Sequence, residues 1–256
     1  MMRHLRTAGA LAALILSAAC GTKEAPGPLE PSGPTGRVRF VNMINDTTRG
    51  RVNAILEGVP FGVNLTYGQS TPATLPAPST ANYSAILTGL RTMLLKRTLD
   101  TSVTVATVSF SVDAGLDLTV YGIGGAGGPG SAVTSLVIGD LNPDIASAAT
   151  RLRVVNLSPT AGAVDIFVTA PNADLAASTP TFANVANRVA SSYATPAPGT
   201  YQVRVVPAGT APAARAAAVL VNVASLALAG GTGRTIVVGD RNIGGAPVTA
   251  FVLTDR

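Results

Sequence analysis

The residue types that most often carry catalysis are rare in this chain. It contains one histidine, His4, and one cysteine, Cys20, both near the start of the sequence. Ser-His-Asp and Cys-His catalysis need a histidine beside the nucleophile, and zinc sites commonly use histidine or several cysteines. The chain after Cys20 therefore lacks the residues for these chemistries, and dispersed carboxylates are what remains for acid–base work.

Three carboxylates, Asp113, Asp117 and Asp165, are the candidates for a site. Asp113 and Asp117 flank a turn at Ala114 and Gly115, where they can contribute to a calcium site. Calcium takes roughly six to eight oxygen ligands, and aspartate is common in turns for local reasons, so we favour the turn interpretation. Asp165 and Asn53 occupy matched positions, and we expect them to be polar residues on a sheet face rather than catalytic groups.

Two pairs of arginines are spaced for strands. Arg37 with Arg39, and Arg151 with Arg153, are two residues apart, which places each pair on one face of a strand. Such pairs can bind an acidic glycan or a lipid headgroup. We favour a solvated face, or protection of an edge strand against aggregation.

A glycine-rich stretch at residues 122–127 (GIGGAG) matches the G-x-G-x-x-G pattern of dinucleotide sites. Such a site needs a helix to begin at these glycines. Here Gly128, Pro129 and Gly130 follow, and then another β-rich run at residues 133–138. The pattern therefore predicts a hairpin loop and no cofactor.

The start of the chain has the pattern of an export signal. Basic residues up to Arg6 precede an apolar run at residues 8–19, which is too short to span a bilayer core of about 30 Å but matches a signal peptide. Small residues at Ser17, Ala18 and Ala19 suit a signal peptidase. We expect residues 1–19 to be removed.

Residues 16–20 (LSAAC) resemble the lipobox of bacterial lipoproteins, although leucine usually stands three places before the cysteine, where this chain has Ser17. The resemblance implies that Cys20 is acylated and becomes the mature N-terminus; the alternative is plain secretion with a free thiol. Two or three acyl chains anchor a protein stably, at about 0.8 kcal/mol per buried CH₂. Because Gly21 rather than aspartate follows, the resemblance implies the outer membrane in a two-membrane bacterium.

The mature sequence begins with a tether and has little charge. Residues 20–36 are rich in proline and glycine, which favour extended conformations over helix or central strand. Charged residues make up 12% of the chain, its arginines are scattered, and aromatic residues are 4%. We therefore expect no nucleic-acid partner, and no later membrane-spanning segment.

The remaining sequence repeats itself. Residues 37–43 (RVRFVNM) are answered by residues 151–157 (RLRVVNL), and residues 133–140 by residues 248–255. Between them, residues 76–78 and Tyr83 correspond to residues 196–198 and Tyr201. We predict one module at residues 37–140, a linker at 141–150 and a second module at 151–256.

Each module has the pattern of short strands. Alternating or β-rich runs fall at residues 101–112, 116–121, 163–169, 201–206, 219–223, 235–238 and 248–253, separated by turn residues. No later segment has a convincing helical period. The pattern predicts an all-β protein made of two tandem antiparallel immunoglobulin-like β-sandwich domains.

Residues 151–159 (RLRVVNLSP), 163–168 (AVDIFV) and 198–205 (PGTYQVRV) look like the bacterial family named domain of unknown function 4397. The likeness covers most of the second module and, more weakly, the first. Asn42 and Asn156 stand where the family usually has histidine. The resemblance implies exported, often repeated β-sandwich modules on cell envelopes and no established catalytic residue.

The sequence leaves two functions open. The first is a non-enzymatic envelope lipoprotein that acts as a structural or protein-interaction module, attached to the membrane through Cys20 and binding an envelope protein or the surface matrix. The alternative is a lipoprotein that captures a small solute or glycan between the two modules. An enzyme is a distant third possibility, with Asp165 as the residue to test.

Overall fold

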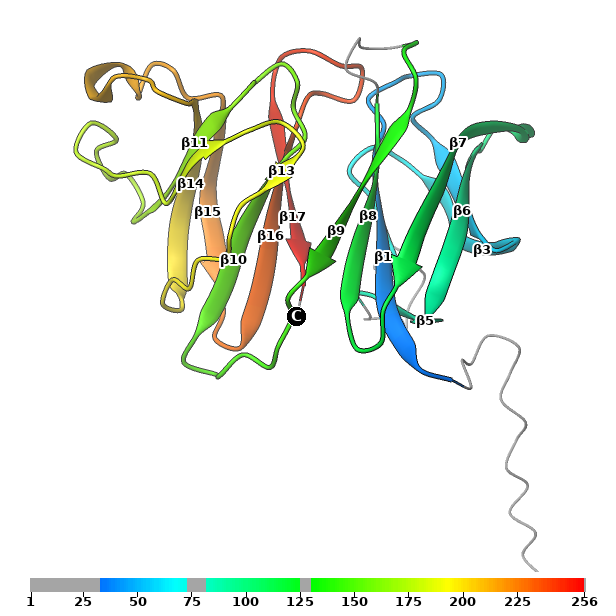
Figure 1. Ribbon diagram of the computed structural model, residues 1–256. Helices are drawn as coiled ribbons and strands as arrows, with labels where there is room; N and C mark the ends of the chain where they lie inside the picture. Colours follow the sequence, from blue (N-terminus) through cyan, green and yellow to red (C-terminus); the bar gives the residue numbers. More distant parts are fainter. Residues whose placement is uncertain (1–32, 73–81, 125–129, 256) are drawn as a thin grey trace, which may run out of the picture.

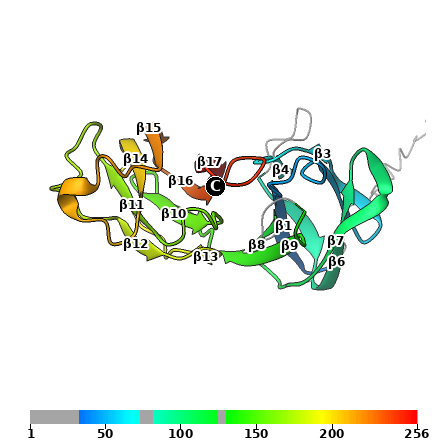
Figure 2. The ribbon, with the colours of Figure 1, turned by 90° about the horizontal axis from the view of Figure 1, so that it is seen from above.

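The computed structural model describes residues 33–72, 82–124 and 130–255. These residues form two β-sandwiches, and their four sheets are stacked in one row (Figures 1 and 2). The expected signal peptide, Cys20 and most of the tether lie outside the described residues, and so does the matched segment at residues 76–78. None of the described residues forms a helix long and apolar enough to cross a membrane.

The first module contains an inner sheet, which faces the second module, and an outer sheet. The inner sheet has the order β4-β1-β8-β9, with β5 also pairing with β1, and the outer sheet has the order β3-β2-β6-β7. The inner strands are β1 (Thr35–Met43), β4 (Ser70–Thr71), β5 (Ser84–Leu87), β8 (Asp117–Ile123) and β9 (Thr134–Asp140). The outer strands are β2 (Val52–Leu56), β3 (Val59–Leu65), β6 (Gly89–Arg97) and β7 (Asp100–Val112).

The second module repeats this arrangement. Its inner sheet has the order β13-β10-β16-β17 and its outer sheet the order β12-β11-β14-β15. The inner strands are β10 (Thr150–Asn156), β13 (Val189–Ala190), β16 (Thr232–Gly239) and β17 (Thr249–Thr254). The outer strands are β11 (Val164–Thr169), β12 (Phe182–Val185), β14 (Gly199–Pro207) and β15 (Val221–Leu228), and one 3₁₀ turn, η1, spans Pro212–Ala214.

The β-sandwich architecture predicted from the sequence is confirmed, with one feature that the sequence pattern did not predict. In each module the first strand along the chain pairs in parallel with the next-to-last strand. These parallel pairs are β1 with β8 and β10 with β16. The remaining strand pairs are antiparallel, including β8 with β9, which are joined through the glycine-rich stretch. The hairpin interpretation of that stretch therefore holds, although residues 125–129 lie outside the described residues.

Each sandwich has its own apolar core, because alternate residues of its strands point inward. Val52, Ala54 and Leu56 show this period of two on β2, and they pack with Phe40 and Val120 of the inner sheet. In the second module Val154, Ile166, Val203 and Ile236 belong to the equivalent core. Each module thus buries apolar side chains between its two sheets.

The inner sheets differ from the outer ones because both of their faces are buried. Every described residue of β1 from Phe40 to Met43 is buried, and β8, β10 and β16 are buried over most of their length. The second buried face belongs to an apolar cluster that joins the modules: Val41, Met43, Tyr121, Ile123, Val155, Leu157, Val237 and Leu253. Sheets covered on both sides read as largely apolar runs, and residues 40–44 and 152–155 are apolar apart from the buried Asn42 and Arg153.

Candidate functional site at the junction of the two modules

The arginine pairs lie where the two inner sheets meet. Arg39 on β1 and Arg153 on β10 point away from their own cores and into the junction, where their exposed fractions are 1% and 2%. Both strands are internal strands of their sheets, because β1 lies between β4 and β8 and β10 lies between β13 and β16. The expectation of a solvated face or a protected edge strand is therefore wrong for these two residues.

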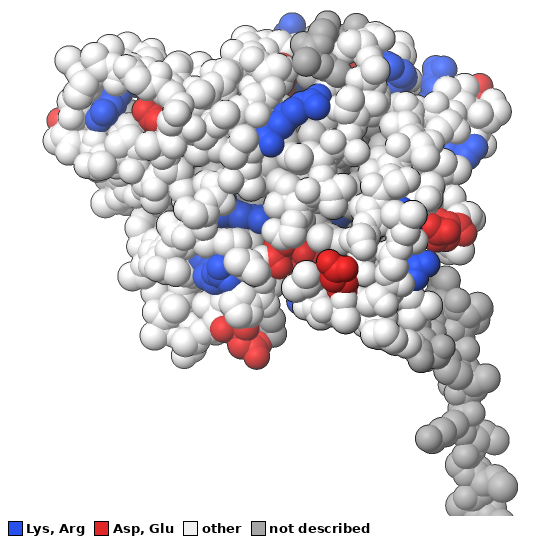
Figure 3. Space-filling model, in the orientation of Figure 1, with Lys and Arg blue, Asp and Glu red and all other residues white. Residues whose placement is uncertain are grey.

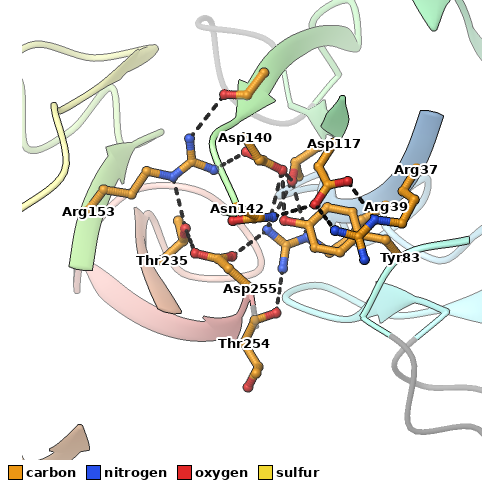
Figure 4. Close-up of polar contacts among 12 residues, drawn as sticks. Arg37, Arg39, Tyr83, Asp117, Asp140, Asn142, Arg153, Thr235, Thr254 and Asp255 are labelled. Atoms are coloured by element: carbon orange, nitrogen blue, oxygen red, sulfur yellow. Dashed lines mark hydrogen bonds and ion pairs between the residues drawn. The ribbon is translucent and has the colours of Figure 1, made fainter. Parts of the chain in front are cut away.

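Arg39 of the first module binds the end of the last strand of the second module. Its guanidinium donates hydrogen bonds to Asp255 Oδ1 at 2.9 Å and to the Thr254 carbonyl at 2.9 Å (Figure 4). Within its own module it donates to Thr119 Oγ1 at 3.0 Å. The arginine therefore ties β1 and β8 of one sandwich to the C-terminal end of β17 in the other.

Arg153 makes the equivalent contacts from the second module to the first. It donates to Asp140, at the end of β9 in the first module, and to Thr235 Oγ1 of its own module at 2.9 Å (Figure 4). The threonines complete the exchange, because Thr119 donates to Asp140 at 2.5 Å and Thr235 donates to Asp255 at 2.6 Å. Each module thus supplies an arginine, a threonine and an aspartate, and each arginine binds the aspartate of the other module.

A tyrosine covers each arginine. The Arg39 guanidinium lies 4.5 Å from the ring centre of Tyr83, and that of Arg153 lies 4.9 Å from the ring centre of Tyr193. Tyr83 also donates its hydroxyl to Asp140 at 2.8 Å. Tyr193 is therefore the counterpart of Tyr83, and the sequence match of Tyr83 with Tyr201 is wrong; the Tyr201 hydroxyl donates to the Ala197 carbonyl at 2.7 Å.

The charged groups of the junction are buried and paired. Burial lowers the pKa of Arg39, but the nearby carboxylates of Asp255 and Asp140 outweigh the burial, so the pKa is raised and the guanidinium stays charged. Burial raises the pKa of Tyr193 to about 12 and also raises that of Tyr83. A buried pair contributes little net stability, but removing one partner leaves an uncompensated buried charge. The arrangement is therefore suited to fixing the two modules in one orientation.

Further contacts join the modules on the far side of the apolar cluster. The Tyr67 hydroxyl donates to the Asp240 carbonyl at 2.5 Å, and the Tyr67 ring meets the Phe251 ring edge-on at 5.3 Å. Arg188 donates to Thr134 at 2.9 Å. A Cβ at Gly239 would approach the Tyr67 hydroxyl to 2.6 Å, so this close approach of the two sheets requires glycine.

The other two arginines of the pairs line a pocket at the open end of the junction. The pocket has a volume of about 470 Å³, and its lining includes Arg37, Leu116, Asp117, Asn142 and Arg151. Arg37 is 47% exposed and binds Asp117 through two hydrogen bonds of 2.7 and 2.6 Å. Arg151 donates to the Leu141 carbonyl at 2.7 Å and stacks on Tyr193. These two arginines remain partly accessible to a ligand.

The carboxylates singled out in the sequence have structural partners. Asp117 binds Arg37 and also accepts a hydrogen bond from Asn142 at 2.7 Å, while Asp113 is exposed. Asp165 is buried and accepts the backbone N–H of Asn184, and Asn53 accepts the N–H of Asn64 in the same way. Among the described residues there is no group of three or more histidine, cysteine or acidic side chains that suits a metal.

Asn42 and Asn156 have a role that the sequence did not reveal. The Asn156 side chain donates to the carbonyls of Gly162 and Val185, at 2.7 and 2.9 Å, and accepts the Ser158 N–H at 3.1 Å. Asn42 makes the equivalent three bonds to Gly50, Leu65 and Ile44. Both side chains are fully buried. Each therefore ties the loop after its inner strand to the end of an outer-sheet strand, β3 in the first module and β12 in the second.

Charge on the surface gives no further site on the face seen in Figure 3. Lysine, arginine and acidic side chains are scattered there among uncharged residues, without a single-sign patch. The largest concentration of charge among the described residues is the buried junction itself.

Comparison with known proteins agrees with this architecture. A family model described as a domain of unknown function, DUF4397, matches residues 36–167, just over half of the chain. The matched residues comprise the first module, the strand β10 and the first four residues of β11 in the second, whereas the sequence likeness was stronger in the second module. No curated protein matches the chain. The chain belongs to the DUF4397 family.

Proposed function

We propose that this protein is a non-enzymatic lipoprotein of the cell envelope, in which two sandwiches form one rigid structural or protein-interaction body. The proposal rests on two reciprocal ion pairs between the modules. Arg39 of the first module binds Asp255 of the second, and Arg153 of the second binds Asp140 of the first. These four side chains are among the most buried charged groups of the described residues, and they join the two modules. Their hydrogen bonds are made to each other and to neighbouring protein groups. This use of charge suits a spacer or a scaffold.

We also propose that the two sandwiches are tandem copies of one module. Support comes from the identical order of their sheets and from the equivalent contacts of Asn42 and Asn156. The equivalent parallel pairs, β1 with β8 and β10 with β16, support the same proposal.

The membrane attachment is proposed from the sequence of residues 1–36. Cys20 would carry the lipid, residues 1–19 would be removed, and the chain up to the start of β1 at Thr35 would tether the body. In the structure β1 begins two residues before the predicted start of the first module at residue 37. In a two-membrane bacterium the proposed location is the outer membrane.

Labelling with a fatty acid tests the anchor. Cells that express the wild type and are fed labelled palmitate should yield labelled protein, and cells that express Cys20→Ala should not. A Ser17→Ala variant is a suitable control, because it alters the region without removing the acylated residue. Label that persists in Cys20→Ala would contradict the assignment.

The second candidate function is capture of a small solute or glycan, and the pocket of about 470 Å³ beside Arg37 and Arg151 is the observation that favours it. Thermal unfolding with and without envelope glycans or solutes discriminates between the two. A ligand-dependent rise in melting temperature that is lost in Arg151→Ala would favour capture. In-cell crosslinking to one protein, with no such rise, would favour the structural role.

A further inference from the structure

The strand β7 forms one edge of the outer sheet in the first module. It runs over 13 residues, Asp100–Val112, and is the longest strand that the structure describes. On one side it pairs with β6, in regular register over residues 106–112 and with register shifts before Ala106, and no described strand pairs with its other side. Its outer edge therefore offers a row of backbone N–H and C=O groups.

Over residues 106–112, where its pairing with β6 is regular, this edge lacks the features that normally prevent pairing with another chain. Proteins protect exposed edges with charged residues, proline, bulges or short strands. Residues 101–112 contain no charged residue and no proline. At the opposite edge of the same sheet β3 contains Pro60, and the corresponding strand β12 has four residues. The contrast within one sheet indicates that β7 is a pairing edge.

The side chains of β7 alternate in a way that favours pairing with an identical strand. Val108, Phe110 and Val112 are buried, whereas Thr107, Ser109 and Ser111 are exposed. In an antiparallel pair with Ser109 opposite its own copy, Val108 lies beside Phe110 and Thr107 lies beside Ser111. Buried apolar residues then meet buried apolar residues, and hydroxyl residues meet hydroxyl residues. No charge would face its own copy across the two-fold axis, and like charges directly opposite each other are destabilising in a strand pair.

We propose that β7 is a dimerisation edge, at which a second copy of this chain adds its own β7 in antiparallel orientation. The two outer sheets of the first modules then become one continuous sheet across the axis. This goes beyond the proposed function and does not rest on the lipid anchor, because the edge lies in the folded body. It gives the protein-interaction role a specific partner.

Sedimentation analysis of the mature chain with Cys20→Ser tests the proposal. This substitution removes the acylation site and the only thiol. The chain should be a dimer at micromolar concentration, and Ser109→Lys should raise the dimer dissociation constant by about tenfold or more, because two lysines would face each other across the axis. A chain that stays monomeric, or a dimer unaffected by Ser109→Lys, would overturn the proposal.

Strand β15 supplies a matched control. It is the corresponding edge in the second module, also without charge or proline, but it has eight residues, and Ser225 is exposed on it as Ser109 is on β7. Ser225→Lys should leave the dimer intact. In a second readout, a short bis-maleimide should crosslink Ser109→Cys chains into dimers and Ser225→Cys chains much less. Equal crosslinking, or dissociation by Ser225→Lys, would contradict pairing through β7.

Discussion

Four arginines at equivalent positions of the two modules play two different roles. Arg37 and Arg151 stay partly accessible beside a pocket, while Arg39 and Arg153, two residues further along their strands, are buried against the other module. The difference comes from depth in the junction, since alternate residues of a strand share a face but not a position along it. The buried pair, Arg39 and Arg153, should matter more for stability, because removing the partner of a buried charge is strongly destabilising.

Replacing one partner of a buried pair should therefore cost far more than replacing an exposed arginine. We expect Arg153→Met to lower the free energy of unfolding by about 3 kcal/mol, because Asp140 would lose its closest cation. Arg51→Met, at an exposed side chain, should cost less than about 0.5 kcal/mol. Urea denaturation followed by circular dichroism measures both.

The double variant Arg153→Met with Asp140→Asn separates the buried charge from the lost packing. It should be more stable than Arg153→Met alone, because the uncompensated carboxylate is gone while an amide still accepts the bonds from Tyr83 and Thr119. A double variant no more stable than the single one would show that charge burial is not the cause.

The buried asparagines should be as sensitive as the arginines. Asn156→Ala leaves two carbonyls and one N–H without their partner, so we expect a loss of roughly 2–4 kcal/mol in the free energy of unfolding. Asn156→Asp keeps the acceptor but sets a carboxylate against two carbonyl oxygens, and it should be no better than alanine. Asn222→Ala, on exposed β15, is the control; a small effect at Asn156 equal to that at Asn222 would refute its role.

The inner sheets explain the sequence pattern at the scale of elements. A sheet in a lone sandwich has one face to the core and one to water, which produces alternation, as in β2. The inner strands β1 and β10 are buried on both faces and read as apolar runs interrupted by arginine. Those runs mark the surfaces through which the two sandwiches stack.

An apolar residue of the junction should behave as a core residue even though it lies outside both sandwich cores. Leu157 belongs to the cluster between the modules and is 4% exposed. Leu157→Ala should destabilise the chain by about 2–5 kcal/mol, whereas Leu99→Ala, at a residue 77% exposed, should change stability by less than about 0.5 kcal/mol. Equal effects in thermal unfolding would contradict a packed junction.

The strands and the sandwich class were predictable, because periodicity and turn residues are local signals. The expected runs at 101–112 and 248–253 correspond to β7 and β17 within one residue at either end. The junction was not predictable, because a period of two places Arg39 on the face away from its own core without telling what covers that face. The pairing of Tyr83 with Tyr201 failed for a related reason, since the true counterpart, Tyr193, lies in an irregular segment outside the named strands.

At the scale of the whole molecule, the two sandwiches form one body of four stacked sheets and not two domains joined only by a linker. In the linker, the Leu141 carbonyl accepts a hydrogen bond from Arg151. The junction itself is formed by the inner sheets and by the ends of β9 and β17. Each side supplies the same kinds of residue, so the junction has the reciprocity of a symmetric dimer interface within one chain. A rigid body of this kind suits a scaffold that holds its edges at fixed positions.

The distance distribution between spin labels on the two modules tests this claim most directly. In the Cys20→Ser chain, Val63→Cys on β3 and Ser225→Cys on β15 place labels on the outer sheets of different modules, and dilution with unlabelled chain isolates the distances within one molecule. Pulsed electron paramagnetic resonance should give one narrow distribution, which broadens when Arg39→Glu and Arg153→Glu are introduced together. A broad distribution in the chain with both arginines intact would contradict the account.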